Sequence, residues 1–229
     1  MPAQVSVLLT PVGGTVPTRA TAVVVDVLRA TSVLTQARLH GARAVVAAGT
    51  PEAALALRAR HPGALLCGER DGRRITGFDL GNSPFEYGFE NVGGRTLIFA
   101  STNGSRALLA AGRARRRILG AFVNASAVLE AVAADELVTV VCSGKLGDSA
   151  LEDTALAGWL VERLAARGVR VAGAAAAFAR RIAPRSDADV RTVVQGASHG
   201  RYLRSLGPGF ARDVEFCAGL DTISQAFEV

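Results

Sequence analysis

Short apolar runs alternate with helical patterns along most of the chain, and this alternation constrains the fold more than any other feature. The runs show little polar alternation, which is typical of strands buried on both faces of a parallel sheet. We predict seven such strands: Val5–Leu9, Ala22–Val25, Ala44–Ala47, Ala64–Cys67, Thr96–Ala100, Arg117–Ala121 and Leu137–Cys142. The pattern therefore predicts an α/β fold, layered α/β/α around a largely parallel or mixed sheet.

Helical patterns fill most of the intervals between these strands, and the last third of the chain is mostly helical. The predicted helices are Ala30–Leu39, Pro51–Arg60, Gly104–Ala111, Ser126–Ala134 with Asn124 as a candidate cap, and most of Leu151–Gly219, before a short terminal strand at Thr222–Phe227. We find no internal repeat and no linker. We expect one domain over residues 1–229, with a subdivision near residues 95–125 as the open alternative.

The segment Gly68–Gly94 interrupts the alternation. It is rich in Gly, Asp, Asn and charged residues, yet Ile75, Phe78, Leu80 and Phe85 are interleaved with them. Long irregular segments in compact domains are usually functional or disordered. The interleaved apolar residues indicate packing, so we interpret the segment as functional.

Charge, termini and cysteines limit the classes of partner. The net charge of +6 fits either an anionic partner or a composition in which Arg replaces Lys on the surface. Only Arg113–Arg117 forms a basic cluster, and without interleaved aromatic residues we expect no nucleic-acid groove.

The longest near-apolar run, Val169–Ala179, is too short for a membrane span of roughly 18 residues. No secretory signal precedes Pro11, which predicts a cytoplasmic protein. Cys67, Cys142 and Cys217 lack C-x-x-C spacing, so we expect reduced, buried thiols rather than a zinc site.

Polar clusters follow five of the predicted strands. Because the carboxyl ends of parallel strands meet at one edge of a sheet, we expect these loops to converge on one rim. The loops contain Asp26–Ser32, Gly68–Asp71, Ser101–Ser105, Asn124–Ser126 and Ser143–Asp148. Ser101–Ser105 and Ser143–Lys145 each combine glycine with small hydroxyl residues, which suits either an ordinary helix start or an anion site. Arg29 on the same rim favours a bound phosphate or sulfonate.

Acidic residues gather in the same loops and suggest a hard cation. The candidates are Asp26, Glu69, Asp79, Asp148, Glu152 and Asp153. Carboxylate oxygens are the ligands that Mg²⁺ prefers, and such an ion would remove the repulsion between the acids and a bound anion. For Glu152 and Asp153, which open a helix, the helix dipole alone is an alternative explanation.

Several phosphoryl-transfer signatures are excluded by single residues. Leu28 stands where an Asp-x-Asp phosphatase needs its second acid, and Gly144-Lys145 is followed by Leu146 rather than by the Ser or Thr of a P-loop. Cys142 lacks an arginine six residues later, since Asp148 stands there. His199 is the one histidine in a polar, glycine-flanked setting.

Seven blocks together resemble the 2-phosphosulfolactate phosphatase family, the ComB-type enzymes. They are DVLRATS, GERDG, GFDLGNSP, STNGSRAL, GAFVNASA, LEDTALAG and SHGRYLRSLG, and they span nearly the whole chain in order. The resemblance implies a layered α/β fold and a magnesium-dependent phosphatase. The implied reaction releases phosphate from 2-phospho-3-sulfolactate, on a route towards coenzyme M.

The resemblance also implies roles for residues in the matching blocks. Asp26, Arg29, Glu152 and Asp153 would be catalytic, and Mg²⁺ would be held by Asp26 with some of Glu69, Asp79, Glu152 and Asp153. Substrate would be bound by Arg29, Thr31, Ser32, Ser101, Thr102, Asn103, Gly104, Asn124, Ser143, Lys145 and His199. Asp26 could serve as metal ligand, as base or as covalent nucleophile, and these alternatives stay open.

The sequence departs from the family pattern at Lys145–Ala150, where KLGDSA stands in place of an expected aromatic residue and serine. This leaves the choice of substrate open among 2-phospho hydroxy acids. A non-catalytic protein that binds an anionic metabolite is the alternative function, and an RNA-binding module acting through Arg113–Arg117 is a third. We expect a small phosphorylated organic acid as the partner, with no nucleic acid and no membrane, and we leave a homo-oligomer open.

Overall fold

The computed structural model describes residues 3–229, and its strands divide between two sheets. The strands are β1 (Gln4–Leu8), β2 (Thr21–Val25), β3 (Ala44–Ala47), β4 (Leu65–Arg70), β5 (Arg73–Arg74), β6 (Thr96–Ala100), β7 (Arg116–Gly120), β8 (Leu137–Cys142) and β9 (Arg170–Ala172). The first sheet has the order β7-β2-β8-β1-β9 and is parallel. The second has the order β3-β6-β4-β5, in which β5 runs antiparallel to β4. The α/β class is confirmed, but the expectation that all five loops share one sheet edge is wrong.

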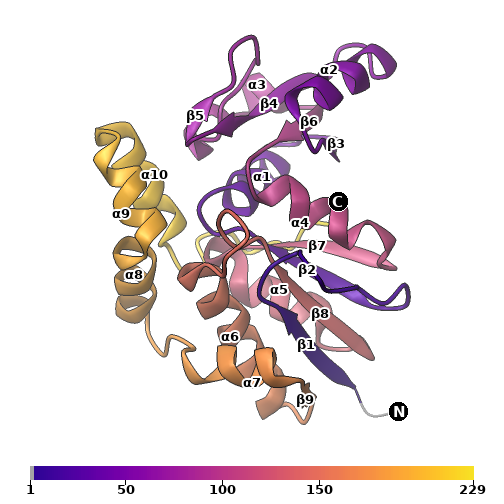
Figure 1. Cartoon of the computed structure of the whole chain (residues 1–229), viewed down its shortest axis with the longest axis vertical. Coiled ribbons are helices and arrows are strands. Elements are labelled where there is room, and N and C mark those ends of the chain that lie inside the picture. The colour runs from indigo at the N-terminus through magenta and orange to yellow at the C-terminus, as the bar shows by residue number, and fades with distance from the viewer. Residues whose placement is uncertain (1–2) are drawn as a thin grey trace.

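Helices separate the two sheets and cover their outer faces (Figure 1). The helices α1 (Ala30–Leu39) and α4 (Gly104–Ala110) lie between the sheets, where they share one apolar cluster with Val24 of β2 and Phe99 of β6. The outer face of the second sheet packs on α2 (Pro51–Arg60). The outer face of the first sheet packs on α5 (Ala125–Val132) and α6 (Leu151–Ala166). The chain therefore forms alternating helical and sheet layers.

The strand β2 shows why the apolar runs lack polar alternation. Val23 and Val25 face the cluster formed with α5 and α6, whereas Ala22 and Val24 face α1 and α4. All five residues of β2 are buried. A strand covered on both faces has no position that favours a polar side chain.

The C-terminal third is helical, as expected. After α6 come α7 (Ala174–Arg181), α8 (Asp187–Gly196), α9 (Ser198–Ser205) and α10 (Pro208–Cys217). The helices α8 to α10 stand along one side of the molecule (Figure 1), packed through Val194, Leu203 and Val214 on the core of the first sheet. The predicted strand Thr222–Phe227 is wrong, because these residues form no strand. The residue that follows them, Glu228, makes a single bridge to Ile118. The short strands β5 and β9 were missed.

Gly68–Gly94, predicted to be irregular, contains little regular structure. It holds the end of β4, the two-residue β5, a 3₁₀ turn at Pro84–Glu86 and the short helix α3 (Phe89–Val92). Phe78 and Tyr87 are buried, which confirms that the segment packs. The chain crosses between the sheets a second time from β6 to β7, within residues 95–125. The single domain, and its subdivision there, stay predictions.

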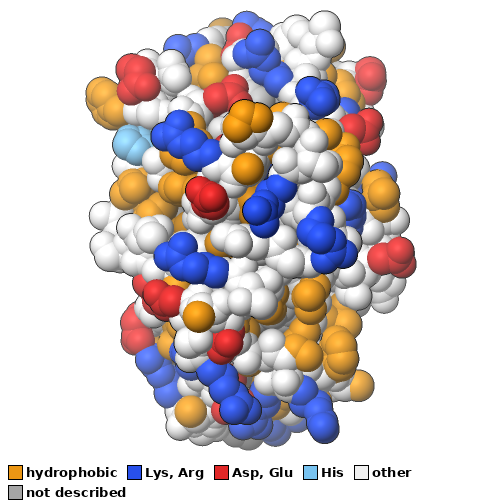
Figure 2. Space-filling model, turned by 90° about the vertical axis from the view of Figure 1, so that its left-hand side faces the viewer, with side chains coloured by type: hydrophobic (Ala, Val, Ile, Leu, Met, Phe, Trp, Pro, Cys, Tyr) orange, Lys and Arg blue, Asp and Glu red, His pale blue; other side chains and the backbone are white. Residues whose placement is uncertain are grey.

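The basic cluster Arg113–Arg117 is partly neutralised. Arg115 and Arg116 form ion pairs with Asp135, and Arg116 also pairs with Glu228. On the face that carries α8–α10, Figure 2 shows Lys and Arg side chains spread out, with Asp and Glu between them. This distribution fits the interpretation that many arginines serve as ordinary surface residues.

Cys67, Cys142 and Cys217 are buried, and none of them forms a disulfide within residues 3–229. In the same part of the chain, no helix has both the length and the apolar character needed to cross a membrane.

The layer between the sheets can be tested by shortening a side chain that fills it. Phe99 of β6 is fully buried and packs in the same apolar cluster as residues of the helices α1 and α4. We expect Phe99→Ala to lower the free energy of unfolding by about 3–5 kcal/mol, because truncation leaves a cavity among packed side chains. Leu55→Ala on the exposed face of α2 is the matched control and should change it by about 0.5 kcal/mol or less. Equal effects in urea denaturation would contradict the layered packing.

Candidate active site

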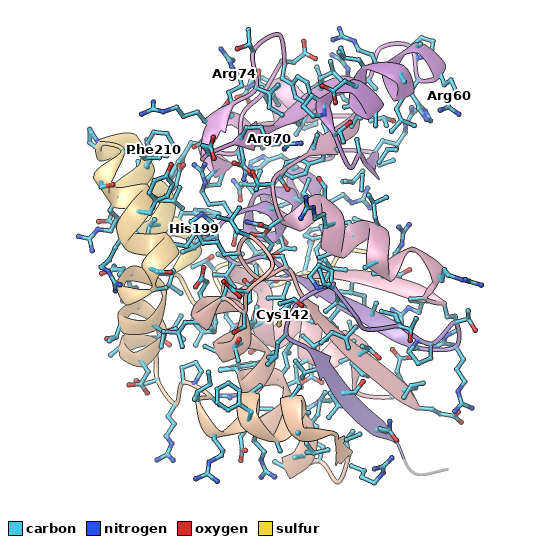
Figure 3. All side chains as sticks on the ribbon, viewed as in Figure 1. Arg60, Arg70, Arg74, Cys142, His199 and Phe210 are labelled. Atoms are coloured by element: carbon cyan, nitrogen blue, oxygen red, sulfur yellow. The ribbon has the colours of Figure 1, made fainter. Side chains whose placement is uncertain are left out.

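A cavity of about 200 Å³ lies where loops of both sheets meet the helix α9. Its lining residues are Asp26, Leu28, Arg29, Glu69, Asp71, Gly72, Asn82, Thr102, Asn103, Lys145, Leu146, His199 and Tyr202. They come from the carboxyl ends of β2, β4, β6 and β8, from the segment Gly68–Gly94 and from α9. In Figure 3, His199 and Phe210 project from the C-terminal helices towards these loops. The expected convergence at strand ends therefore occurs for four of the five predicted loops, but between two sheets, and the loop Asn124–Ser126 does not line the cavity.

Asp26 is held in a tight loop directly after β2. Its backbone N–H donates to Oγ1 of Thr31 (3.0 Å), and the N–H of Thr31 donates to the Asp26 carbonyl (3.0 Å). Its carboxylate oxygen Oδ1 accepts from the N–H of Ala30 (3.2 Å). These bonds turn the chain so that the Asp26 carboxylate faces the cavity. Thr31 is thus a structural residue, since it is buried and does not line the pocket.

Gly104 allows the helix α4 to begin against Asp26. A Cβ atom at this position would lie 2.6 Å from Oδ2 of Asp26 and 2.5 Å from Cβ of Ala30. Any larger residue would push the Asp26 carboxylate or α1 aside. The glycine, predicted as a substrate-binding residue, therefore also gives space to Asp26.

Burial raises the pKa of Asp26 to about 6. The neighbouring His199 lowers this pKa, and repulsion by Glu69 raises it. An acid whose ionised form is disfavoured in this way is stabilised by a cation or a proton beside it. Asp26 is therefore the carboxylate of the pocket most responsive to a bound ligand or ion.

Asp153 joins the loop after β2 to the loop after β8. Its Oδ1 accepts from the N–H of Val27 (2.8 Å), and its Oδ2 accepts from Oγ of Ser143 (2.9 Å) and the N–H of Gly144 (3.1 Å). Burial, followed by repulsion from Asp26 and Glu152, raises the pKa of Asp153 well above its usual range. Neither Asp153 nor Ser143 lines the cavity. The structure thus places both behind the pocket, where they fix its loops.

Glu69 holds together loops of the second sheet while also lining the pocket. Its Oε1 accepts from the N–H of Thr102 (2.8 Å), and its Oε2 accepts from the N–H of Gly72 (2.8 Å). The preceding Gly68 has φ +138°, and a Cβ there would lie 1.8 Å from the carbonyl oxygen of Ala100. Only glycine lets β4 pass this close to β6 and place Glu69 between the two loops.

Arg29 is buried, and its guanidinium is fixed by groups from two distant segments. It donates to Asp213 of α10 in an ion pair and to the carbonyl of Gly72 (2.5 Å), and it lies 5.2 Å from the ring centre of Phe210. Asp213 is itself held by Oγ of Ser83, which donates to it (2.6 Å). The predicted phosphate clamp therefore shares its charge with a carboxylate that the sequence analysis missed.

His199 approaches the pocket from α9 with an acid behind it. Its Nδ1 lies 3.7 Å from Oε1 of Glu152, and its ring stacks near that of Tyr202 with centroids 6.4 Å apart. Glu152 is buried at the start of α6 and does not line the cavity. The structure thus brings Glu152 to His199 rather than to the ligand space.

Several other predicted ligand residues bond to the protein and do not line the pocket: Ser32, Ser101, Asn124 and Asp79. Ser32 donates to the carbonyl of Val27 (2.8 Å), and Ser101 accepts from the N–H of Ser105 (3.0 Å). Asn124 does not cap α5 through its side chain; its amide accepts from the N–H of Ala121 (3.0 Å) and donates to the carbonyl of Leu119 (3.1 Å). Asp79 accepts from the N–H of Leu66 (2.8 Å) and pairs with Arg58.

The pocket also contains Tyr202, which the sequence analysis did not select, together with Asp71 from the predicted rim loop Gly68–Asp71 and Asn82 from the block GFDLGNSP. Tyr202 lies three residues after His199 in α9, so helical spacing could have indicated it. Asn82 is 5% exposed, and its Oδ1 has no hydrogen-bond partner among the described residues. A buried amide without a partner normally finds one in water or a ligand. This supports a polar ligand in the cavity.

The donor set fits Mg²⁺ only in part. Within residues 3–229, no three His, Cys, Asp or Glu side chains are grouped as a metal cage. Magnesium, however, is often held by one or two carboxylates together with substrate phosphate and water. Asp26 and Glu69 line the pocket, and Oδ2 of Asp26 accepts no backbone N–H from any described residue, although each oxygen of Glu69 accepts one. These two acids fit such an ion, whereas Asp79 and Asp153 do not line the pocket.

The fold and the site define an α/β protein whose small pocket combines acidic and basic side chains from loops of two sheets and from α9, which is typical of enzymes acting on small anionic substrates. The chain belongs to the 2-phosphosulpholactate phosphatase family, whose model matches residues 10–229. This is a family of phosphoric monoester hydrolases, and the resemblance inferred from the seven blocks is confirmed.

Three relatives illustrate the similarity, and each carries the name "Probable 2-phosphosulfolactate phosphatase". The protein of Thermotoga petrophila is 40% identical over 201 residues, covering 88% of this chain and 85% of the relative. That of Gloeobacter violaceus is 40% identical over 225 residues, covering 96% and 93%. That of Deinococcus radiodurans is 41% identical over 207 residues, covering 88% and 84%.

Removing Asp213 tests whether α10 holds Arg29 in place. We expect Asp213→Ala to lower the free energy of unfolding by about 3–5 kcal/mol, because it leaves the buried Arg29 charge without a counterion. Adding Arg29→Met to this variant should restore much of the loss. Glu130→Ala, which breaks the exposed pair with Arg167, is the control and should leave stability nearly unchanged. Similar losses in both single variants, measured by urea denaturation, would show that the buried pair has no special role.

Proposed function

We propose that the protein hydrolyses 2-phospho-3-sulfolactate, or a closely similar 2-phospho hydroxy acid, to the hydroxy acid and inorganic phosphate in a Mg²⁺-dependent reaction. The observation that carries the proposal is the buried Asp26 carboxylate, which faces a small pocket beside Arg29, Lys145 and His199. A cavity of about 200 Å³ suits a small organic acid. The names of the relatives support the same substrate.

The charged groups of the pocket suggest how the substrate is held. The phosphoryl group would lie near Arg29, whose remaining N–H groups can donate to its oxygens. Of the four backbone amides in Ser101–Gly104, those of Ser101 and Thr102 are taken by Ser105 and Glu69. The amides of Asn103 and Gly104 have no acceptor among the described residues. These two would complete the phosphate contacts.

Mg²⁺ would be held by Asp26 and Glu69 and, when bound, would supply positive charge that offsets the negative charge of the phosphoryl group. His199 lines the pocket and would give a proton to the oxygen that leaves with the hydroxy acid, with Glu152 3.7 Å behind its ring. Asp153, Thr31 and Gly104 would keep the Asp26 loop in position. Asp26 would take the proton from the attacking water or act as nucleophile.

Phosphate release from 2-phospho-3-sulfolactate tests the assignment of Asp26. We expect Asp26→Asn to lower kcat/KM at least about 100-fold, because the variant loses both the metal-binding charge and the proton acceptor. Asp79→Asn is the matched control: it also removes a predicted metal ligand, but from a site outside the pocket, and it should keep most of the activity. Chelation of divalent cations should abolish release by the wild type, and added Mg²⁺ should restore it. Full activity of Asp26→Asn would contradict the proposal.

Single-turnover hydrolysis in ¹⁸O-labelled water, together with an acid quench, distinguishes the two roles of Asp26. We propose direct attack by water, for which the label appears in the released phosphate and no phosphorylated enzyme is trapped. A covalent aspartyl-phosphate would either leave the label in Asp26 or, if water attacks at phosphorus, release labelled phosphate, and in both cases mass spectrometry of the acid-quenched peptide that contains Asp26 would detect the phosphorylated residue. Location in the cytoplasm and a place on a route to coenzyme M stay predictions.

A further inference from the structure

Lys145 differs from the other basic side chains of the pocket because its charge is not paired. Arg29 pairs with Asp213, and His199 lies 3.7 Å from Glu152. Lys145 lies within 4 Å of no carboxylate in the part of the chain that the structure describes. It is also the one lysine in a sequence whose other basic charge is carried by arginine and histidine. A cation that lines an enclosed pocket without a counterion is available to an anionic ligand.

Backbone hydrogen bonds of Lys145 and of its two neighbours, Gly144 and Leu146, fix the position of this loop. Its N–H donates to the carbonyl of Asp148 (2.8 Å), and the N–H of Asp148 donates back to the Lys145 carbonyl (3.0 Å). The N–H of Gly144 donates to Asp153 (3.1 Å), and the N–H of Leu146 donates to Oδ1 of Asn103 (3.0 Å). The loop is thus tied both to the core and to the loop after β6. These bonds position Lys145 at the pocket even without a ligand.

The Lys145 ammonium group lies against an aromatic ring that is itself anchored. Nζ is 5.0 Å from the ring centre of Tyr202, within the range of a cation–π contact. The Tyr202 hydroxyl donates to the carbonyl of Asp71 (3.2 Å) on the opposite loop. Because the Tyr202 ring carries no charge, its contact orients the Lys145 ammonium group and leaves the positive charge without a counterion. The pocket therefore has a second cationic position, separate from the ion pair that holds Arg29.

We propose that Lys145 binds the second anionic group of the substrate, which is the sulfonate of 2-phospho-3-sulfolactate, and thereby selects phosphorylated hydroxy acids that carry a terminal anion. This inference rests on the function proposed above. An ammonium group is a compact charge that suits a sulfonate, which needs no planar bidentate partner. The selection acts on a part of the substrate remote from the bond that breaks. Loss of Lys145 should therefore raise KM more than it lowers kcat.

A pair of substrates that differ in the terminal anion tests the role of Lys145. The probes are 2-phospho-3-sulfolactate and 2-phospholactate, which keeps the phosphate and carboxylate but lacks the sulfonate. We expect Lys145→Met to lower kcat/KM for the sulfonated substrate by about 10- to 100-fold and to lower kcat/KM for 2-phospholactate by a much smaller factor. Arg167→Met is the control, because it removes one positive charge from an exposed position.

Two results would overturn the role of Lys145: equal losses on both substrates, or no loss on either. Binding measured by calorimetry separates this proposal from the proposed function. Wild type should bind 3-sulfolactate more tightly than lactate, and Lys145→Met should abolish the difference. Preferential binding that depends on Lys145, without phosphate release from either substrate, would uphold the subsite and overturn the phosphatase assignment. Equal binding of both acids by the wild type would overturn the subsite.

Discussion

The site depends on burying the Asp26 carboxylate at the place where loops of the two sheets meet. The strand β2 ends there, and the loop is turned back by Thr31 while Gly104 removes the side chain that would collide with Oδ2. Desolvation raises the pKa of Asp26 to about 6, so the folded chain holds an acid whose charge its surroundings oppose. Such an arrangement costs stability and is typical of functional sites. The packing of α1 and α4 between the sheets keeps the acid in place.

The acidic residues divide into those that face the ligand space and those that build it. Asp153 satisfies three donors and joins the loops after β2 and β8, while Asp79 and Glu152 lie outside the cavity lining. Glu69 lines the ligand space and also helps to build it, since each of its oxygens accepts a backbone N–H at the pocket wall. Each of these two carboxylates joins loops within one sheet, Glu69 in the second sheet and Asp153 in the first. The acidic clusters of the sequence therefore contain residues that hold the loops of the site together as well as residues that face the ligand.

Much of the fold could be predicted because each buried strand carries its own local signal. The runs at Thr96–Ala100 and Leu137–Cys142 and the helix Pro51–Arg60 were predicted with their observed ends. The division into two sheets could not be predicted, because apolar runs buried on both faces look alike whichever neighbours they have. For the site, Asp26, Arg29, Glu69 and Lys145 follow from loops at strand ends. Asp213 gave no signal, since an acid in an amphipathic helix usually faces water.

The balance of charge explains how a pocket rich in acids can accept an anion. The positive charge of Arg29 is shared with Asp213, so Arg29 offers directed N–H groups more than net charge. His199 is similarly placed beside Glu152. The remaining basic side chain of the described pocket, Lys145 on the loop after β8, has no ion-pair partner, whereas Asp26 and Glu69 supply the acidic groups. The pocket thus contains both acids and a cation without an ion-pair partner, and a ligand that carries phosphate, a bound cation and a terminal anion would match both. A simple phosphate ester would leave Lys145 unmatched, so under the proposed function the choice of substrate would depend on this loop more than on the acids around Asp26.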